Sequence, residues 1–403
     1  MVAPATGGAD TGRPQLRVTD IFRRHGEAYG ADHALVPAQQ KVLRNLGACR
    51  TALLGGHLEV CDACGFERPA YNSCRDRHCP GCQAAASHAW LEQRLERVLP
   101  THHFHVVFTL PEELRPLALR NGAVVYDILL RAAAHVLDVL GRQRLGAQLG
   151  VTSVLHTWTR AMLYHPHVHC VVTGGGLALD GSKWVPTPRG FLLPVAVMRK
   201  LFRGMVRRQL RVAYDAGKLD LGGACTEHAD PRTFARLLRS LFRKRWVVYS
   251  KPPFAGADSV FRYLGRYTHR VAISDHRLRA ITDHSVTFGT KHGQQATVAP
   301  TEFIRRFLLH VLPSGFHKIR HTGIYAATNV HTRLARAGEL LGASQVAAPI
   351  AGPPDEDEPG EAVDAVRDVD RSCPCCKVGT LVRIEVPRPR SHLPPRPPPV
   401  DSS

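Results

Sequence analysis

Long apolar segments are missing from this chain of 403 residues. It contains no run of about eighteen or more apolar residues, the minimum for a helix that crosses a membrane. Its first residues, MVAPATGGADTGRPQLR, lack the apolar core of a secretory signal. We therefore expect a cytoplasmic protein with no membrane partner.

Acidic residues are scarce relative to basic ones. The chain has 34 Asp and Glu against 53 Lys and Arg, a formal net charge of +19. Residues 355–403 hold 10 acidic and 7 basic residues, so residues 1–354 carry a net charge of +22. A field of this sign attracts polyanions, of which nucleic acid is the commonest. The charge favours a nucleic-acid partner, although a basic protein that is merely soluble has the same composition.

Internal repeats and a regular strand–helix–strand alternation are absent from the sequence as well. Strand-like and helix-like segments follow each other at irregular spacing, which favours an α+β fold with a mostly antiparallel sheet. The expected strands cover residues 103–110, 151–158, 167–173 and 246–250, with short strand signals in 271–298. The expected helices cover residues 83–99, 112–140, 194–216, 231–245, 258–267 and 301–311, with short helices in 18–54.

Composition divides the chain into five segments. Residues 1–17 are rich in Gly, Ala and Pro and are expected to be disordered. Residues 18–100 are expected to form a helical and zinc-binding domain, and residues 101–342 a larger α+β domain. Residues 343–372 have the acidic, Pro-rich composition of a linker. Residues 373–403 hold a small group of cysteines and a tail rich in Pro and Arg.

The cysteines favour metal binding over disulfides. There are 11 of them, an odd number, in a chain without a secretory signal. The strongest motif is Cys61-x2-Cys64, followed after fourteen residues by Cys79-x2-Cys82. Two such pairs suit four thiolates around one tetrahedral zinc ion. Gly65 after the first pair and the Pro-Gly within the second favour the tight turns that zinc knuckles need.

The zinc segment leaves two points open. His57, Cys74 and His78 are further candidate ligands, so a second zinc or a different set of four fits the sequence too. Arginines in the segment suit a contact with phosphates, but a purely structural zinc domain fits equally well. Near the C-terminus, Cys373 and Cys376 also have CxxC spacing, but no second pair follows them. We interpret that pair as a truncated or degenerate zinc ribbon.

A histidine pair points to a second kind of metal site. Residues 165–173 read HPHVHCVVT, and in a strand His167 and His169 project from the same face. Two imidazoles on one face form part of a divalent metal site. Histidines of this kind are also found simply buried in a core, and the chain has 23 of them. A third ligand would come from His156 on the neighbouring predicted strand or from the segment 258–270.

That segment, DSVFRYLGRYTHR, contains two tyrosines at helical spacing. In a helix, Tyr263 and Tyr267 share one face. A tyrosine hydroxyl can attack a phosphodiester to form a covalent intermediate, provided that cations or a metal assist it. The alternative is a pair of core aromatics on an amphipathic helix. Arginines that could contact the DNA backbone, or form only a solvated surface, are Arg262, Arg266 and Arg270 in this segment and Arg203 and Arg207 in the basic helix 194–216.

Together these motifs resemble a known family. HFHVVFTLPEEL, HPHVHCVV and YLGRYTHR follow the order of the three motifs of the HUH endonucleases, in which a hydrophobic residue separates two histidines. The preceding CRDRHCPGCQ resembles the zinc-binding region of the two-tyrosine, rolling-circle transposases of bacterial insertion sequences. The resemblance extends over roughly residues 20–342.

The resemblance implies an antiparallel sheet flanked by helices, with the histidine pair on a central strand. It implies Mg or Mn on His167 and His169, in addition to the structural zinc. Tyr263 and Tyr267 match the two tyrosines that, in this family, form a 5′-phosphotyrosine link. The expected partners are the single-stranded DNA ends of the protein's own element and target DNA.

Two other functions remain compatible with the sequence. A plasmid rolling-circle replication initiator or relaxase uses the same chemistry, but a zinc segment ahead of the histidine motif favours the transposase. A non-catalytic, zinc-containing DNA-binding protein is the second alternative. The presence of both histidines and both tyrosines argues against it.

Overall fold

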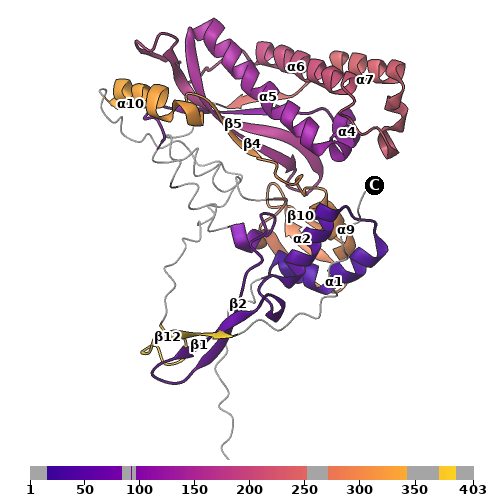
Figure 1. Cartoon of the computed structure of the whole chain (residues 1–403), viewed down its shortest axis with the longest axis vertical. Coiled ribbons are helices and arrows are strands. Elements are labelled where there is room, and N and C mark those ends of the chain that lie inside the picture. The colour runs from indigo at the N-terminus through magenta and orange to yellow at the C-terminus, as the bar shows by residue number, and fades with distance from the viewer. Residues whose placement is uncertain (1–15, 84–91, 93–96, 252–270, 343–371, 387–403) are drawn as a thin grey trace, which may run out of the picture.

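A computed structural model describes residues 16–83, 92, 97–251, 271–342 and 372–386. Figure 1 shows a layer of helices over a large sheet, a second compact unit beneath it, and a small sheet furthest from the helices. The sheets are antiparallel, so the expected α+β class with antiparallel pairing is confirmed. No helix in the described parts of the chain is long and apolar enough to cross a membrane.

The large sheet has six strands in the order β11-β4-β5-β3-β7, and β6 pairs with β5 beside this path. The middle strand, β5, is therefore the one that carries the predicted histidine pair. Its strands are β3 (His103–Thr109), β4 (Ala147–Trp158), β5 (Tyr164–Ala178), β6 (Trp184–Pro186), β7 (Val248–Lys251) and β11 (Ile319–Gly323). The strands predicted at 151–158 and 167–173 lie within β4 and β5.

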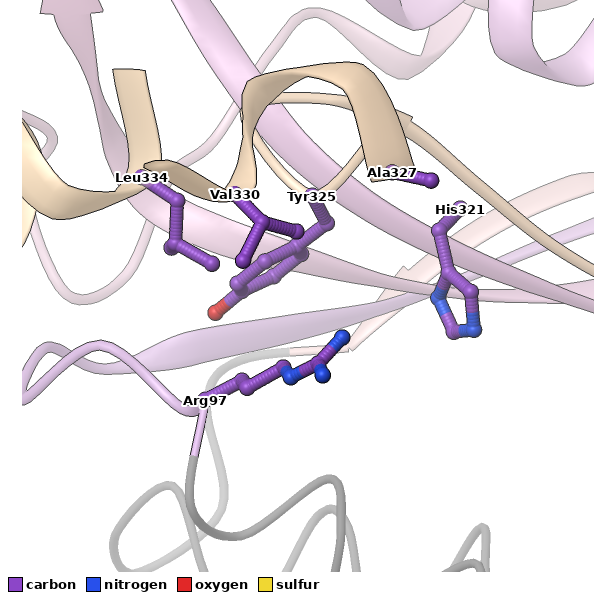
Figure 2. A pocket seen from close by; sticks show the side chains of 6 residues that line it. All are labelled: Arg97, His321, Tyr325, Ala327, Val330 and Leu334. Atoms are coloured by element: carbon purple, nitrogen blue, oxygen red, sulfur yellow. The ribbon is translucent and has the colours of Figure 1, made fainter. Parts of the chain in front are cut away.

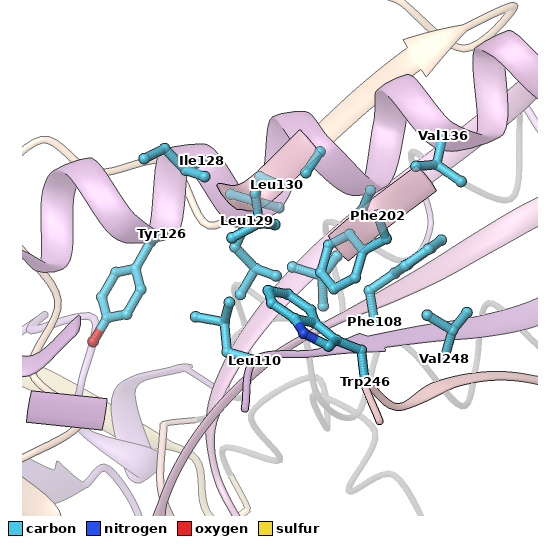
Figure 3. Packing of buried hydrophobic residues seen from close by; sticks show 14 of the residues in the cluster. Phe108, Leu110, Tyr126, Ile128, Leu129, Leu130, Val136, Phe202, Trp246 and Val248 are labelled. Atoms are coloured by element: carbon cyan, nitrogen blue, oxygen red, sulfur yellow. The ribbon is translucent and has the colours of Figure 1, made fainter. Parts of the chain in front are cut away.

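Helices cover one face of this sheet. Alternate residues of β3 and β5, such as Phe108 and Cys170, point into this core. Figure 3 shows the Phe202 ring of the helical layer packed between Phe108 and Trp246, with ring centroids 5.0 and 5.3 Å away. Burying each such side chain contributes roughly 1.5–3 kcal/mol. The helices of this layer are α4 (Arg115–Arg120), α5 (Gly122–Leu140), α6 (Val195–Asp215) and α7 (Pro231–Arg243).

The N-terminal helices share a second core with a distant part of the chain. The Phe22 ring packs edge-on against Phe307 with centroids 5.1 Å apart, and the Val18 amide donates to the Asp275 carboxylate at 2.9 Å. Residues 271–308, which composition placed in the larger domain, therefore pack with the N-terminal helices. The elements are α1 (Val18–Asp32), α2 (Pro37–Ala48), β8 (Leu278–Ile281), β9 (Val286–Gly289), β10 (Gln295–Val298) and α9 (Pro300–Leu308).

A third unit joins segments from near the two ends of the chain. Strand β1 (Gly56–Cys61) pairs with β2 (Glu67–Tyr71) on one side and with β12 (Leu381–Val386) on the other. In Figure 1 the yellow β12 lies beside the indigo β1. Helix α10 (Ala335–Gly342) packs elsewhere, near Leu99 and Leu177.

Two expected helices lie largely or wholly outside the described residues: 258–267, which carries the two tyrosines, and most of 83–99. The helix expected over 112–140 is interrupted at Asn121, whose side chain bonds the Asp220 backbone, and forms α4 and α5. The strand expected from Trp246 begins at Val248, because the Trp246 indole turns inward to donate to the Leu241 carbonyl at 2.9 Å.

Candidate functional site

Three histidines meet on the face of the large sheet that is opposite its helices. His156 of β4 pairs directly with His167 of β5, and His169 lies two residues further along β5. Ligand nitrogens of these three side chains all lie within 4.8 Å of one another. The predicted pair is therefore brought together, and His156, the first candidate for the third ligand, joins it.

Hydrogen bonds orient the two imidazoles of β5. Nδ1 of His167 lies 2.6 Å from the His165 carbonyl, which can only accept, so Nδ1 carries the proton and Nε2 keeps its lone pair. Nδ1 of His169 lies 2.7 Å from Nε2 of His105 on β3. Donation from His169 to His105 leaves the Nε2 lone pair of His169 for a metal, the usual arrangement of an outer partner behind a ligand. His105 is a site residue that was not singled out from the sequence.

Burial keeps these imidazoles uncharged. It lowers the pKa of His167 to about 4, against the opposing effect of the His165 carbonyl. Burial also lowers the pKa of His169 well below its ordinary value, and the nearby His156, His167 and His105 add to the effect. Both side chains are therefore neutral near pH 7 and can act as ligands.

An aromatic ring and a lysine ammonium group lie beside the histidine triad. The Trp158 ring stacks on His156 with centroids 4.6 Å apart, and the Lys318 ammonium lies 5.8 Å from the centre of the Trp158 ring. The edge strand β7 ends at Lys251, which pairs in register with His105. The residues that follow include Tyr263, Tyr267, Arg262, Arg266 and Arg270, all of which lie outside the described residues.

The two other predicted DNA contacts lie away from this face. Arg203 and Arg207 are on α6, in the helical layer on the opposite side of the sheet. Arg203 donates to the Phe242 carbonyl at 2.8 Å and Arg207 to the Leu238 carbonyl at 2.7 Å. Both guanidinium groups also lie over the Phe242 ring, at 4.3 and 4.9 Å. These contacts hold α6 against α7.

A small pocket opens further along the histidine face. Figure 2 shows Arg97, His321 and Tyr325 among the side chains that line it. His321 of β11 pairs with Thr152 of β4, and its Nδ1 lies 3.0 Å from the Thr152 hydroxyl. Thr152 is four residues before His156 on the same strand and so on the same face. The pocket and the histidine triad therefore lie along one surface.

The cysteines form two clusters of four, which corrects the predicted zinc site. Cys61, Cys64, Cys79 and Cys82 were expected to share one ion, but the two pairs are separated. One cluster is Cys49, Cys74, Cys79 and Cys82, and the other is Cys61, Cys64, Cys373 and Cys376. The CxxC turn fixes only the two sulfurs within a pair, and the packing of α2 and β12 determines which sulfurs complete each set.

The sulfur geometry of the first cluster fits zinc. Sγ of Cys82 lies 3.6 Å from Sγ of both Cys49 and Cys74, and Sγ of Cys79 lies 3.7 Å from Sγ of Cys49. Four thiolates at about 2.3 Å from a tetrahedral zinc are separated by about 3.8 Å. A disulfide would need sulfurs about 2.05 Å apart. Of the additional candidates, Cys74 is in this cluster, while Cys49 was not singled out because it stands alone at the end of α2.

The two candidate histidine ligands have other partners. His78 Nδ1 lies 2.8 Å from the Asp76 carboxylate, and His78 Nε2 accepts from the Leu312 amide at 3.2 Å. Burial raises the pKa of Asp76, but hydrogen bonds from His78 and Asn45 outweigh this and hold it at about 2. His57, on β1, has Nε2 3.5 Å from Glu59. Neither histidine belongs to a cysteine cluster.

Two arginines of the zinc segment are also bonded within the protein. Arg77 donates to the carbonyls of Pro313 and Phe316 at 2.7 and 2.8 Å, and Arg68 donates to Glu59 at 2.5 Å. The contacts of Arg77 tie the first cluster to the segment that leads into β11. Arg77 therefore has a structural role.

Two known families match successive parts of the chain. A family described as "Transposase zinc-binding domain" matches residues 21–110, which include the first cysteine cluster. A family described as "Putative transposase" matches residues 150–332, which include the three histidines and the two predicted tyrosines.

Two relatives of the chain carry similar names. The chain is 46% identical over 382 residues to "Putative transposase y4qJ" of Sinorhizobium fredii, covering 92% of this chain and 95% of the relative. It is 28% identical over 287 residues to "Transposase for insertion sequence element IS801" of Pseudomonas savastanoi pv. phaseolicola, covering 69% of this chain and 68% of the relative. No solved structure matched the chain.

Proposed function

Because the chain belongs to the family of insertion-sequence transposases with an N-terminal zinc-binding domain, we propose that it nicks and rejoins single-stranded DNA through a 5′-phosphotyrosine link. The observation that carries the proposal is the triad of His156, His167 and His169 on the face of an antiparallel sheet opposite its helices. This arrangement supports an HUH endonuclease fold. The proposed biological reaction is rolling-circle transposition in the cytoplasm.

The histidine triad would hold a divalent ion. Three imidazoles suit a transition-metal ion better than Mg²⁺, which prefers oxygen ligands, so Mn²⁺ fits this donor set more closely. When bound, such an ion neutralises charge on the scissile phosphate. His105 would act as a positioning residue, since its contact with His169 Nδ1 fixes which nitrogen of His169 faces the ion.

The nucleophile would be Tyr263 or Tyr267. Both belong to the segment that leaves the sheet after Lys251, a residue in register with His105. The phenol would lose its proton and its oxygen would bond to phosphorus as the bond from phosphorus to the 3′ oxygen breaks, and the released 3′ oxygen would take up a proton to become a hydroxyl. The new ester conserves the phosphodiester linkage, so a later 3′-hydroxyl could reverse the step. A second tyrosine would let two strand ends be held in sequence.

The DNA would lie along the histidine face of the sheet. The pocket with Arg97 and His321 continues this face beyond the triad. Arg262, Arg266 and Arg270 would add positive charge beside the tyrosines, and the net charge of +19 would favour the approach of a polyanion. The partners would be the ends of the protein's own element and target DNA.

The proposal is tested by trapping the covalent intermediate. Full-length protein is incubated with single-stranded DNA that carries the element's ends, in the presence of Mn²⁺, and denatured before electrophoresis. We expect a DNA adduct that maps to Tyr263 or Tyr267 and disappears when both are changed to Phe. Tyr249→Phe is the matched control, because Tyr249 is an exposed tyrosine on nearby β7 and should leave the adduct intact.

An adduct formed normally by the double Phe variant would refute the tyrosine mechanism. Binding without any nicking by the wild-type protein, under conditions where the zinc content is intact, would support the non-catalytic alternative. Nicking of a plasmid origin rather than the element's ends would support a replication initiator or relaxase.

A further inference from the structure

The second cysteine cluster joins two parts of the chain that lie far apart in sequence. Cys61 is the last residue of β1 and Cys64 follows it, whereas Cys373 and Cys376 precede β12. We propose that these four cysteines bind a second structural zinc ion, so that residues 372–386 complete the N-terminal zinc-binding domain. The family match for that domain ends at residue 110 and does not include this C-terminal segment.

The sulfur positions match a tetrahedral zinc site. Sγ of Cys61 lies 3.7 Å from Sγ of Cys376, and Sγ of Cys64 lies 3.6 Å from Sγ of Cys373. All four sulfurs lie within 4.8 Å of one another. The tetrahedron edge for zinc thiolates is about 3.8 Å, and a disulfide would need about 2.05 Å. The set therefore fits a metal ion and not a pair of disulfides.

The two cysteine pairs have the same local turn. The Gly65 amide donates to the Cys61 carbonyl at 3.1 Å, and the Lys377 amide donates to the Cys373 carbonyl at 3.0 Å. Gly65 and Lys377, each directly after the second cysteine of its pair, both adopt left-handed backbone, with φ of 69° and 61°. A lysine rarely adopts this conformation without a constraint. The C-terminal pair is thus built as a full zinc knuckle, which corrects its interpretation as a degenerate one.

Backbone amides point at the sulfurs, as expected around thiolates. The Cys64 amide donates to Cys61 Sγ at 3.5 Å, the Cys375 amide to Cys373 Sγ at 3.4 Å, and the Gly379 amide to Cys376 Sγ at 3.3 Å. Such bonds stabilise the negative charge of a ligand sulfur. Both knuckles donate such hydrogen bonds, so the sulfurs of both cysteine pairs are arranged to bind a metal ion as thiolates.

The fit between the knuckles is close. A Cβ at Gly379 would lie 2.5 Å from Cys61 Sγ and 2.6 Å from the Ala63 side chain. The Asp62 amide donates to the Thr380 carbonyl at 3.1 Å, and the Thr380 amide donates to the Asp62 carboxylate at 2.7 Å. Only glycine at 379 allows the C-terminal turn to approach the first knuckle this closely.

Apolar packing alone is a weak reason for β12 to dock. Leu381 is buried beside Cys61 and Cys373, but Val382 and Ile384 are about half exposed, at 51% and 52%. A small three-stranded sheet with so little buried apolar surface is marginal without a further constraint. A zinc ion held by two thiolates from each side supplies that constraint, because metal binding is coupled to folding.

The first test counts zinc in the purified, reduced, full-length protein. We expect two zinc ions per wild-type chain and one in Cys373→Ser/Cys376→Ser. Cys375→Ser is the matched control, because Cys375 is exposed, lies between the two ligands and is not one of the four; it should retain two. Cys61→Ser/Cys64→Ser should also retain one, and adding the C-terminal pair of changes should remove no more zinc.

Equal zinc content in the wild-type chain and in Cys373→Ser/Cys376→Ser would overturn the proposal. Because a variant can misfold, a second measurement uses the unmodified protein. Cys64 and Cys375 are both exposed, but only Cys64 is a proposed ligand. In brief alkylation followed by mass spectrometry, Cys375 should react at least tenfold faster than Cys64, and a chelator should remove the difference. Equal rates before chelation would contradict a second zinc, and neither test depends on the nuclease chemistry.

Discussion

His105 offers a sharp test of the metal site, because it contacts a proposed ligand without being one. Its Nε2 lies 2.7 Å from Nδ1 of His169, and the two rings are stacked with centroids 5.0 Å apart. Replacing it with Ala removes the partner that selects the tautomer of His169. Loss of such an outer partner typically weakens metal binding by about 10- to 100-fold. We expect the dissociation constant for Mn²⁺ to rise by that factor in His105→Ala.

The assay is calorimetric titration of zinc-loaded, full-length protein with Mn²⁺, alongside nicking rates as a function of Mn²⁺ concentration. Saturating Mn²⁺ should restore most of the nicking rate of His105→Ala, because the three ligands are still present. His105→Gln should recover part of the affinity, since its side-chain oxygen can accept from His169. His321→Ala, on the same face but bonded to Thr152, is the control and should bind Mn²⁺ normally. Wild-type Mn²⁺ affinity in His105→Ala would refute the positioning role.

Three further predictions concern the scaffold. Phe307→Ala should lower the free energy of unfolding by about 3–5 kcal/mol in chemical denaturation, because its fully buried ring packs on Phe22, whereas Ala at the half-exposed Phe191 should change it little. Burial lowers the pKa of His103 and of His310 to about 4, so the unfolded chain binds protons more readily than the folded one as the pH falls from about 6.5 to 4. The free energy of unfolding should therefore fall by about 3 kcal/mol per histidine over this range. In denaturation measured at several pH values, His310→Gln should show a weaker dependence of stability on pH than the wild type. Arg207→Ala should lower the free energy of unfolding by about 1.5–3 kcal/mol, because the Leu238 carbonyl loses its hydrogen-bond donor. The affinity of this variant for single-stranded DNA, measured by fluorescence anisotropy, should stay within twofold of that of the wild type. A large loss of affinity would instead assign Arg207 to the DNA-binding surface.

The grouping of the three histidines could largely be predicted, because it depends on residues that are close together in the sequence. Strand periodicity places His167 and His169 on one face, and the short connection after Trp158 makes β4 and β5 antiparallel neighbours. His156 then falls opposite His167. His105 was missed because its role depends on β3 pairing with the other side of β5, where Val107 is opposite His169. No spacing rule within the chain indicates that contact.

The zinc ligands were less predictable for the opposite reason. A CxxC turn brings two sulfurs together within four residues, but which pairs share an ion depends on how distant segments pack. Cys49 reaches the first cluster because α2 ends there, and Cys373 reaches the second because β12 pairs with β1. The sharing of a core between α1 and residues 271–308 is equally non-local. The composition of the chain indicates neither the two ligand sets nor this shared core.

The first zinc cluster and the histidine site are physically connected through one short stretch of chain. In the zinc segment, Arg77 binds the carbonyls of Pro313 and Phe316, and His78 accepts from the Leu312 amide. Residues 312–316 lead directly into β11, which pairs with the strand that carries His156. Just before them, His310 contacts the Thr157 hydroxyl, one residue beyond His156. The zinc-binding domain therefore braces the edge of the sheet beside the histidine triad, so Arg77 and His78 support the histidine face without needing any direct contact with DNA.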